Sequence, residues 1–220
     1  MSTFTQLPAN GPDPKAKGYV GPRGTVTDGM MVYTYMQVGD LKFNSTTERE
    51  YCTSLVVDKT TAKAFKKAFP KNGYKEVDTA DFEDKYKVLP LYPDEDEQFI
   101  IKFAASTVMK FDAPAAGVKA GDKVPYAWAS RPKALSPVEG GVKDITFDED
   151  AQIGNGTKGH VAFSITSNDF GTFPQFRSVY VTELVKKWHR RLRLLQRMLL
   201  LRMLLLPLTQ ALLLIRSSKF

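Results

Sequence analysis

Aromatic and basic residues are interleaved along several segments of this chain, and together they could bind a single-stranded nucleic acid. Tyr33 and Tyr35 lie in one β-rich run, and Lys102 precedes Phe103 in another. Bases stack on aromatic rings, which is worth roughly 1–3 kcal/mol per base, while cations follow the phosphate backbone. The candidate residues for such binding are Tyr33, Tyr35, Lys102, Lys110, Trp128, Arg131 and Arg177.

Many of the aromatic rings are expected to be unavailable for stacking, because rings in β-proteins more often fill the core. The period of two along a strand places Tyr33 and Tyr35 on one face with Met31, and the residues between them on the other. Lys102 faces away from its apolar neighbours, so its strand has one apolar and one wet face. The rings expected in the core are those of Phe65, Phe99, Phe103 and Phe163.

Residues for catalysis or metal binding are scarce. His160 and His189 are the two histidines and Cys52 is the one cysteine, which is too few for a zinc site built from these ligands. The sequence contains no nucleophile elbow, P-loop or dinucleotide-binding fingerprint. We therefore expect no enzymatic activity, no cofactor and no small-molecule substrate. The single cysteine lies in an apolar run, where burial is expected, and it excludes an internal disulfide framework.

Three further segments resemble ligand loops but are interpreted as turns or solvated loops. Residues 154–159, Gly-Asn-Gly-Thr-Lys-Gly, are rich in glycine but lack the spacing of a phosphate-binding loop. The acidic runs at 94–97 and 148–150 contain carboxylates that a divalent cation could use, yet such runs are usually solvated. The sequence therefore predicts no metal site.

Short strands predominate among the elements that would position these residues. One helix is predicted over 59–69, because Asp58 is a good N-cap and apolar residues recur on one helical face. Residues 71–97 are charged and irregular, which predicts a loop. The predicted strands cover 19–27, 30–38, 41–43, 51–57, 99–106, 108–111, 123–130, 143–147, 159–166 and 176–185. One helix with this many strands predicts a mainly β barrel, since closure removes sheet edges.

The basic charge of the chain is concentrated at its C-terminal end. The chain has 31 Lys and Arg against 24 Asp and Glu, a net charge of +7. Nine of the basic residues and none of the acidic ones lie in 186–220, so the rest has 22 basic against 24 acidic residues, a net charge of −2. The net charge of the whole chain is therefore no argument for nucleic-acid binding by its folded part.

Residues 186–220 allow three interpretations. The stretch 198–215 is mostly apolar, but Arg202 and Pro207 interrupt it, and a membrane-spanning helix needs about 20 consecutive apolar residues. Residues 188–197 are basic and apolar, as helices at membrane surfaces or in partner grooves are. The third interpretation, which we favour, is translation out of frame, because the shifted codons permit a flexible acidic tail rich in Ala and Asp.

Three stretches of the chain carry a likeness to a known family. They are Tyr51–Ala68, Gln98–Ser106, and Ile153–Ile165 together with Phe176–Val185. They resemble the phage-encoded single-stranded DNA-binding proteins with an OB fold, and the likeness covers most of residues 30–185. The resemblance implies a mainly β, OB-fold-like, partly open barrel with one main α-helix and loop insertions.

The same resemblance implies a function. Proteins of this family bind single-stranded DNA without sequence preference, in support of phage DNA replication and recombination in the cytoplasm of the infected bacterial host. Their acidic C-terminal tail recruits phage replication proteins and competes with DNA for the basic groove. The present tail is basic, so it departs from that pattern, and an out-of-frame acidic tail would restore it. The N-terminal sequence lacks the basic and apolar regions of a secretory signal.

The expected organisation has three parts. Residues 1–29 form an extended N-terminal segment, residues 30–185 form the single-stranded DNA-binding barrel, and residues 186–220 form the atypical tail. Two other classes of function stay open. The chain could be a phage structural or assembly barrel whose aromatics pack between subunits, or a membrane-associated protein that uses residues 188–215. A carbohydrate-binding barrel is a weaker option, since aromatic rings also stack on sugars.

Overall fold

Strands form most of the computed structural model, which describes residues 1–41, 48–110, 119, 123–125, 131–148 and 152–186. For residues 37–41, 109, 110 and 123–125 the description covers the backbone alone. The chain divides into two units, Met1–Lys186 and Lys187–Phe220. All elements below belong to the first unit. Apart from Lys186, the tail predicted over 186–220 falls on the second unit, outside the described residues.

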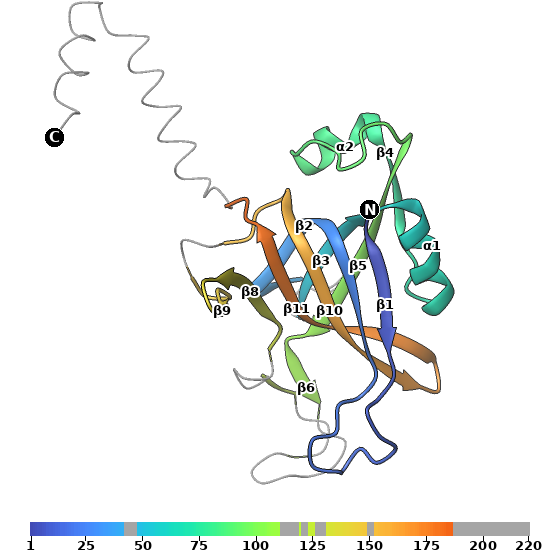
Figure 1. Ribbon diagram of the computed structural model, residues 1–220, viewed down its shortest axis with the longest axis vertical. Coiled ribbons are helices and arrows are strands. Elements are labelled where there is room, and N and C mark those ends of the chain that lie inside the picture. The colour runs from blue at the N-terminus through green and yellow to red at the C-terminus, as the bar shows by residue number, and fades with distance from the viewer. Residues whose placement is uncertain (42–47, 111–118, 120–122, 126–130, 149–151, 187–220) are drawn as a thin grey trace, which may run out of the picture. The chain divides into compact units, whose positions relative to one another are not determined.

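The described elements follow one another as β1 Thr3–Leu7, β2 Arg23–Leu41, β3 Arg49–Val57, α1 Lys59–Ala68, β4 Lys75–Asp78, α2 Thr79–Tyr86, β5 Glu97–Ser106, β6 Val108–Lys110, β7 Lys123–Pro125, β8 Lys133–Val138, β9 Gly141–Asp144, β10 Thr157–Asn168 and β11 Gly171–Glu183. The main sheet has the order β4-β5-β3-β2-β10-β11-β8-β9, with β1 added beside β2 (Figure 1). Its neighbours are antiparallel except β8 and β11, which are parallel. Strands β6 and β7 form a separate hairpin.

The long strand β2 gives the sheet its barrel form. Its first part pairs with β10, with Val26 opposite Val161, and its later part pairs with β3, with Met30 opposite Val56. The far strand β11 then contacts β5 without pairing with it in the sheet order. Five strands, β2, β3, β5, β10 and β11, thus curl into a partly open barrel of the OB type. The fold class predicted from the sequence is confirmed.

Phenylalanine side chains fill the inside of the barrel. Phe65 of α1 packs edge-on against Phe103 of β5 and Phe163 of β10, at centroid distances of 5.4 and 6.1 Å. Phe4 of β1 joins them, 5.6 Å from Phe65. The four rings predicted in the core are all buried, namely Phe65, Phe99, Phe103 and Phe163. The N-terminal strand therefore contributes to the same core as the barrel strands.

The predicted helix is confirmed as α1, and its N-cap ties it to the N-terminus. Asp58 accepts a hydrogen bond from the Thr61 N–H at 2.8 Å. Its other carboxylate oxygen accepts from the N–H and the hydroxyl of Ser2, each at 2.9 Å. Burial alone would raise the pKa of Asp58, but these hydrogen bonds outweigh it and lower the pKa below its usual value.

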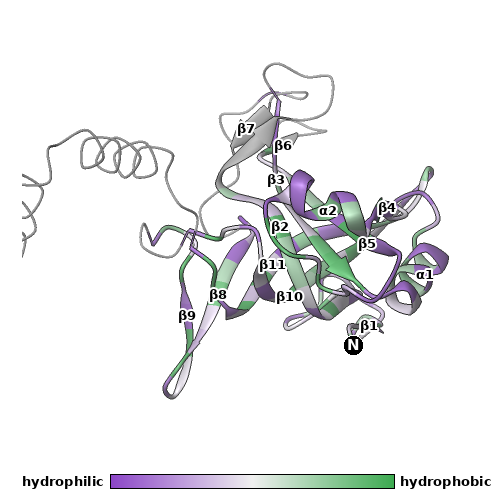
Figure 2. Cartoon of the chain, turned by 90° about the horizontal axis from the view of Figure 1, so that it is seen from above, coloured by the Kyte–Doolittle hydropathy of each residue, from purple (hydrophilic) through white to green (hydrophobic). Residues whose placement is uncertain are grey.

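A second apolar cluster lies outside the barrel, beneath α2 and β4. It consists of Met30, Val32, Val56, Val77, Phe82, Tyr86 and Ile100. The prediction of a loop across 71–97 was therefore wrong. Phe82 and Tyr86, one turn apart, are the buried residues of this otherwise charged helix. A segment this short is stable as a helix only because it packs against the sheet. Figure 2 shows this contrast, since hydrophobic colours concentrate on the central strands while the helix ribbons carry both colours.

Several strand boundaries differ from those predicted. β2 begins at Arg23, so the expected division between residues 29 and 30 falls inside a strand. β1 was not predicted, because Phe4 alone among its residues turns away from solvent. β8 also escaped prediction, since Pro137 suggested a turn, and the strand expected over 143–147 is shifted to β9.

Candidate nucleic-acid interface

The outer face of β2, β3 and β5 has a covered half and an open half. In the covered half, α2 lies over Met30, Val32, Val56 and Ile100. In the open half, side chains surround a depression of about 330 Å³, and they are Tyr33, Tyr35, Cys52, Ser54 and Lys102. The two tyrosines and the lysine were predicted as binding residues, and the structure brings these three together.

Strand register explains why the open half is polar. Ser54 of β3 lies opposite Lys102 of β5, and Cys52 lies opposite both Tyr35 and Ala104. The intervening residues Thr53 and Phe103 point into the barrel and are buried. The period of two thus places Thr53 and Phe103 inside and the polar set outside, as predicted for Lys102.

The predicted alternation along β2 was wrong at Tyr33. The register with β3 shifts between Val32 and Tyr35, and Tyr33 has a positive φ of 53°. A bulge of this kind inserts one extra residue and turns the side chains that follow. As a result, Met31 lies in the barrel core, whereas Tyr33 and Tyr35 both line the outer depression.

Hydrogen bonds fix Tyr33 in this unusual backbone conformation. Its N–H donates to Asn155 Oδ1 at 2.8 Å, and its hydroxyl donates to the Lys85 carbonyl at 2.9 Å. Asn155 Nδ2 donates in turn to the Tyr86 carbonyl at 2.8 Å. The Tyr33 ring lies 5.1 Å from that of Tyr86 and keeps 42% of its surface exposed. Strained residues held by their surroundings in this way cluster at binding sites.

Lys102 brings the positive charge of the open half, in an ion pair with Glu50 of β3. The Lys102 side chain is 56% exposed and that of Glu50 16% exposed. An ion pair at the surface is worth about 0–1 kcal/mol, because water screens it. Because the Lys102 ammonium is on the exposed side of this pair, a phosphate group can compete with Glu50 for it.

Arg131 and Arg177, two further predicted binding residues, do not line this depression. The Arg131 guanidinium lies 6.0 Å from the ring of Tyr51, a buried residue on the inner face of β3. Arg177 of β11 donates from Nε to Ser164 Oγ at 2.9 Å. It lines a different depression, of about 530 Å³, together with Arg23.

The two remaining predicted residues are not located as side chains. Lys110 ends β6, where the backbone alone is described, and Trp128 lies outside the described residues. Sequence reasoning in turn missed Asn155, Glu50 and Ser54. Asn155 lies in the glycine-rich segment that was interpreted as a turn. Its neighbouring glycines were the sequence feature that could have indicated its role. The other two are recognised only from the pairing of β3 with β5.

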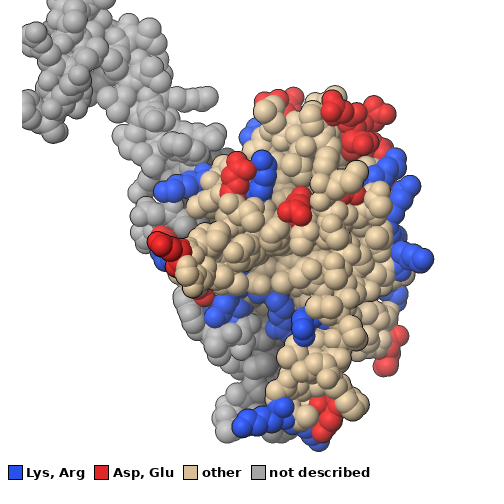
Figure 3. Space-filling view, in the orientation of Figure 1, with Lys and Arg blue, Asp and Glu red and all other residues tan. Residues whose placement is uncertain are grey.

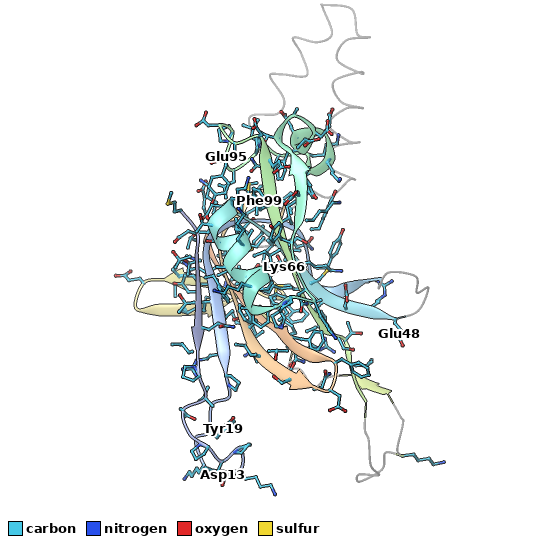
Figure 4. The ribbon with its side chains drawn as sticks, turned by 90° about the vertical axis from the view of Figure 1, so that its right-hand side faces the viewer. Asp13, Tyr19, Glu48, Lys66, Glu95 and Phe99 are labelled. Atoms are coloured by element: carbon cyan, nitrogen blue, oxygen red, sulfur yellow. The ribbon has the colours of Figure 1, made fainter. Side chains whose placement is uncertain are left out.

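Charge is distributed unevenly over the barrel. The acidic residues of the α2 region and of the turn before β5 are Glu76, Asp78, Asp81, Glu83, Asp84, Asp94, Glu95, Asp96 and Glu97. Figure 4 shows Glu95 at one end of the barrel and Asp13 and Tyr19 of the β1–β2 loop at the other. In Figure 3, acidic side chains gather mainly at the top, and most of the basic ones lie lower or at the right-hand edge. A polyanion would therefore avoid the α2 end.

The described part of the chain offers neither a metal site nor a membrane-spanning helix. Its histidines, cysteines and acidic residues form no group of three that could hold a metal ion. Among these residues there is likewise no helix with the length and apolar character needed to cross a membrane.

Comparison with solved structures gives a distant likeness to one phage protein. The C-terminally truncated single-stranded DNA-binding protein from bacteriophage Enc34 is 14% identical, with 80% of this chain and 96% of that chain covered and a TM-score of 0.42. The same protein in complex with single-stranded DNA is 15% identical, with 81% and 97% covered and a TM-score of 0.40. No protein-family model matches the chain, and no curated protein matches it either.

Proposed function

We propose that the open half of the sheet binds single-stranded DNA without sequence preference. Bases would stack on the exposed ring of Tyr33 and the half-buried ring of Tyr35, and Lys102 would leave Glu50 to neutralise a phosphate. Every base has a π-face, so stacking of this kind accepts any sequence, and the phosphate contact makes binding sensitive to salt.

The observation that carries this proposal is the convergence of two tyrosines and a lysine on one depression. That depression lies over β3 and β5, the second and third strands of the barrel counted from β2. In OB folds the face of the second and third strands is where oligonucleotides bind. In keeping with the sequence resemblance, we propose that the chain acts in phage replication and recombination in the host cytoplasm, with replication proteins as further partners.

The test is a fluorescence-anisotropy titration of a labelled oligo-dT strand with the full-length chain, beside a duplex of the same length. We expect salt-sensitive binding of the single strand and much weaker binding of the duplex. Tyr35→Ala should weaken binding by roughly 5- to 150-fold, which corresponds to the 1–3 kcal/mol of one stacked base.

Matched variants separate the ring from the fold. Tyr35→Phe keeps the ring and should bind as the wild type does. Tyr33→Asn removes the second ring but tolerates a positive φ, so the backbone of β2 is preserved. Unchanged affinity in the folded triple variant Tyr33→Asn, Tyr35→Ala and Lys102→Ala would refute the site.

A further inference from the structure

A second depression, separate from the open half, lies between the β1–β2 loop and strands β10 and β11. Its volume is about 530 Å³, within the range of about 300–1,000 Å³ that is usual for ligand pockets. Arg23 and Arg177 are its charged lining residues, and no acidic residue lines it. Its apolar lining comes from Leu7, Tyr19, Val20, Pro22, Phe163 and Ile165.

Arg177 is presented to this depression by a bulge in β11. The register pairs Ala162 with Ser178 and Phe163 with Phe176, so Arg177 is the extra residue between them. Its Nε donates to Ser164 at 2.9 Å and its Nη2 to Gln175 at 3.2 Å. These bonds hold the exposed guanidinium in one orientation and leave its other N–H groups available for a ligand. Because the side chain is already ordered, less conformational entropy is lost when a ligand binds.

Neither arginine is neutralised within the described part of the chain. The ion pairs found there involve other residues, and both arginines are exposed. An exposed arginine without an acidic partner suits phosphate or carboxylate oxygens, because its planar guanidinium can donate two parallel hydrogen bonds.

We propose that this second depression binds a nucleotide of a single DNA strand, with the phosphate on Arg23 and Arg177 and the base against the apolar lining. The inference rests on the proposed single-stranded DNA binding and extends it beyond the face of β3 and β5. The strand would thus be held at two places on the barrel, one rich in aromatic rings and one rich in arginine.

The surrounding charge favours a polyanion over a single acidic group. Lys15 and Lys17 are exposed in the β1–β2 loop that leads to Arg23, and Asp13 is the one acidic residue of this loop. The acidic region around α2 lies at the other end of the barrel (Figure 4). Cations spread along a loop match regularly spaced phosphates, and the depression beside them has room for a base.

The first experiment replaces the two cations with neutral polar side chains. Arg23→Gln with Arg177→Gln is compared with Lys63→Gln with Lys67→Gln, which removes two exposed cations of α1 that line neither depression. Affinity for labelled oligo-dT is measured across a series of salt concentrations. For the arginine pair we expect affinity about tenfold lower at low salt, and a salt slope less steep by about 0.7, the value of one phosphate contact on a single strand. The lysine pair should keep the wild-type slope.

A second experiment places a charge in the depression itself. Val20 is 43% exposed, so its replacement need not disturb the core. Val20→Glu and Val20→Gln have the same shape and differ in one negative charge. We expect Val20→Glu to weaken oligo-dT binding several-fold more than Val20→Gln, with equal thermal stability of the two variants.

The outcomes distinguish this inference from the proposed function. If the wild type binds oligo-dT while the arginine pair keeps wild-type affinity and slope, the inference is overturned and the open half remains the binding site. Retained DNA affinity together with binding of an acidic peptide would assign the depression to a protein partner instead. Equal effects of Val20→Glu and Val20→Gln would also overturn it. If the wild type does not bind single strands at all, the proposed function and the inference fail together.

Discussion

The covered and open halves of the β2–β3–β5 face differ in a single step along the strands. Val56 opposite Ile100 is apolar and lies beneath α2, while Ser54 opposite Lys102, two residues away, is polar and open. α2 has 8 residues and is about 12 Å long, whereas the 10 residues of β5 extend over about 33 Å. The helix is too short to cover the whole face, so one sheet surface provides both an apolar core and the candidate site.

Hydrogen bonds of one side chain link the two halves. Asn155 bridges the two halves, since it accepts from the Tyr33 N–H and donates to the Tyr86 carbonyl. The open half therefore depends on the covered half for the position of its ring. Variants in the covered half should change stability first, and variants in the open half should change binding first.

The largest effect is expected from Phe82→Ala in the covered half. Phe82 is fully buried, with its ring 4.6 Å from that of Tyr86. Truncation of a buried phenylalanine costs about 3–5 kcal/mol of unfolding free energy, because apolar contacts are lost and a cavity remains. Urea denaturation measures this value. Phe170→Ala, at a residue that is 73% exposed, is the control and should change stability by less than about 0.5 kcal/mol.

A smaller effect is expected from Asn155→Ala, which cuts the link between the halves. The Tyr33 N–H and the Tyr86 carbonyl lose their partner, at a cost of about 1–3 kcal/mol if they stay unpaired. DNA affinity should fall as well, because the ring of Tyr33 is no longer fixed. A double-mutant cycle with Tyr33→Asn measures the coupling. If the two variants lower affinity additively, Asn155 does not act through Tyr33.

Asp58 lies outside both halves, and its replacement should change the stability of the fold. Its folded pKa lies below the unfolded value of about 3.9, so its carboxylate stabilises the fold fully above that pH. This contribution is lost as the pH falls through the lower, folded pKa. We expect Asp58→Ala to lower the unfolding free energy by about 0.5–2 kcal/mol at pH 7, and by progressively less below pH 4.

Thermal or urea unfolding between pH 7 and pH 2.5 checks this prediction. Affinity for oligo-dT at pH 7 should not change, because Asp58 lines neither depression. If the difference in unfolding free energy between the wild type and Asp58→Ala stays constant down to pH 2.5, the charge of the carboxylate does not stabilise the fold.

The sequence predicted the features that depend on residues close together in the chain. Asp58 and the apolar face of 59–69 predicted α1, and the alternation around Lys102 predicted its outward direction. The bulge at Tyr33 could not be predicted, because the hydrogen bonds that hold its positive φ come from Asn155 and Lys85, far away in the chain. Arg177 was predicted as a binding residue, but the neighbours that place it at a second depression are fixed by the pairing of β10 with β11.

The smallest effect, and the one that tests the open half most directly, is expected from Glu50→Gln. Glu50 pairs with Lys102, so its neutralisation should release the ammonium for a phosphate and raise DNA affinity. The gain is limited to about 1 kcal/mol, roughly fivefold, since the pair is partly exposed. The gain should shrink as salt increases, because screening weakens the pair and the phosphate contact alike. In a Lys102→Ala background the gain should vanish. A gain that persists there would mean that Glu50 repels DNA directly, and lower affinity would mean that the ion pair positions Lys102 for the phosphate.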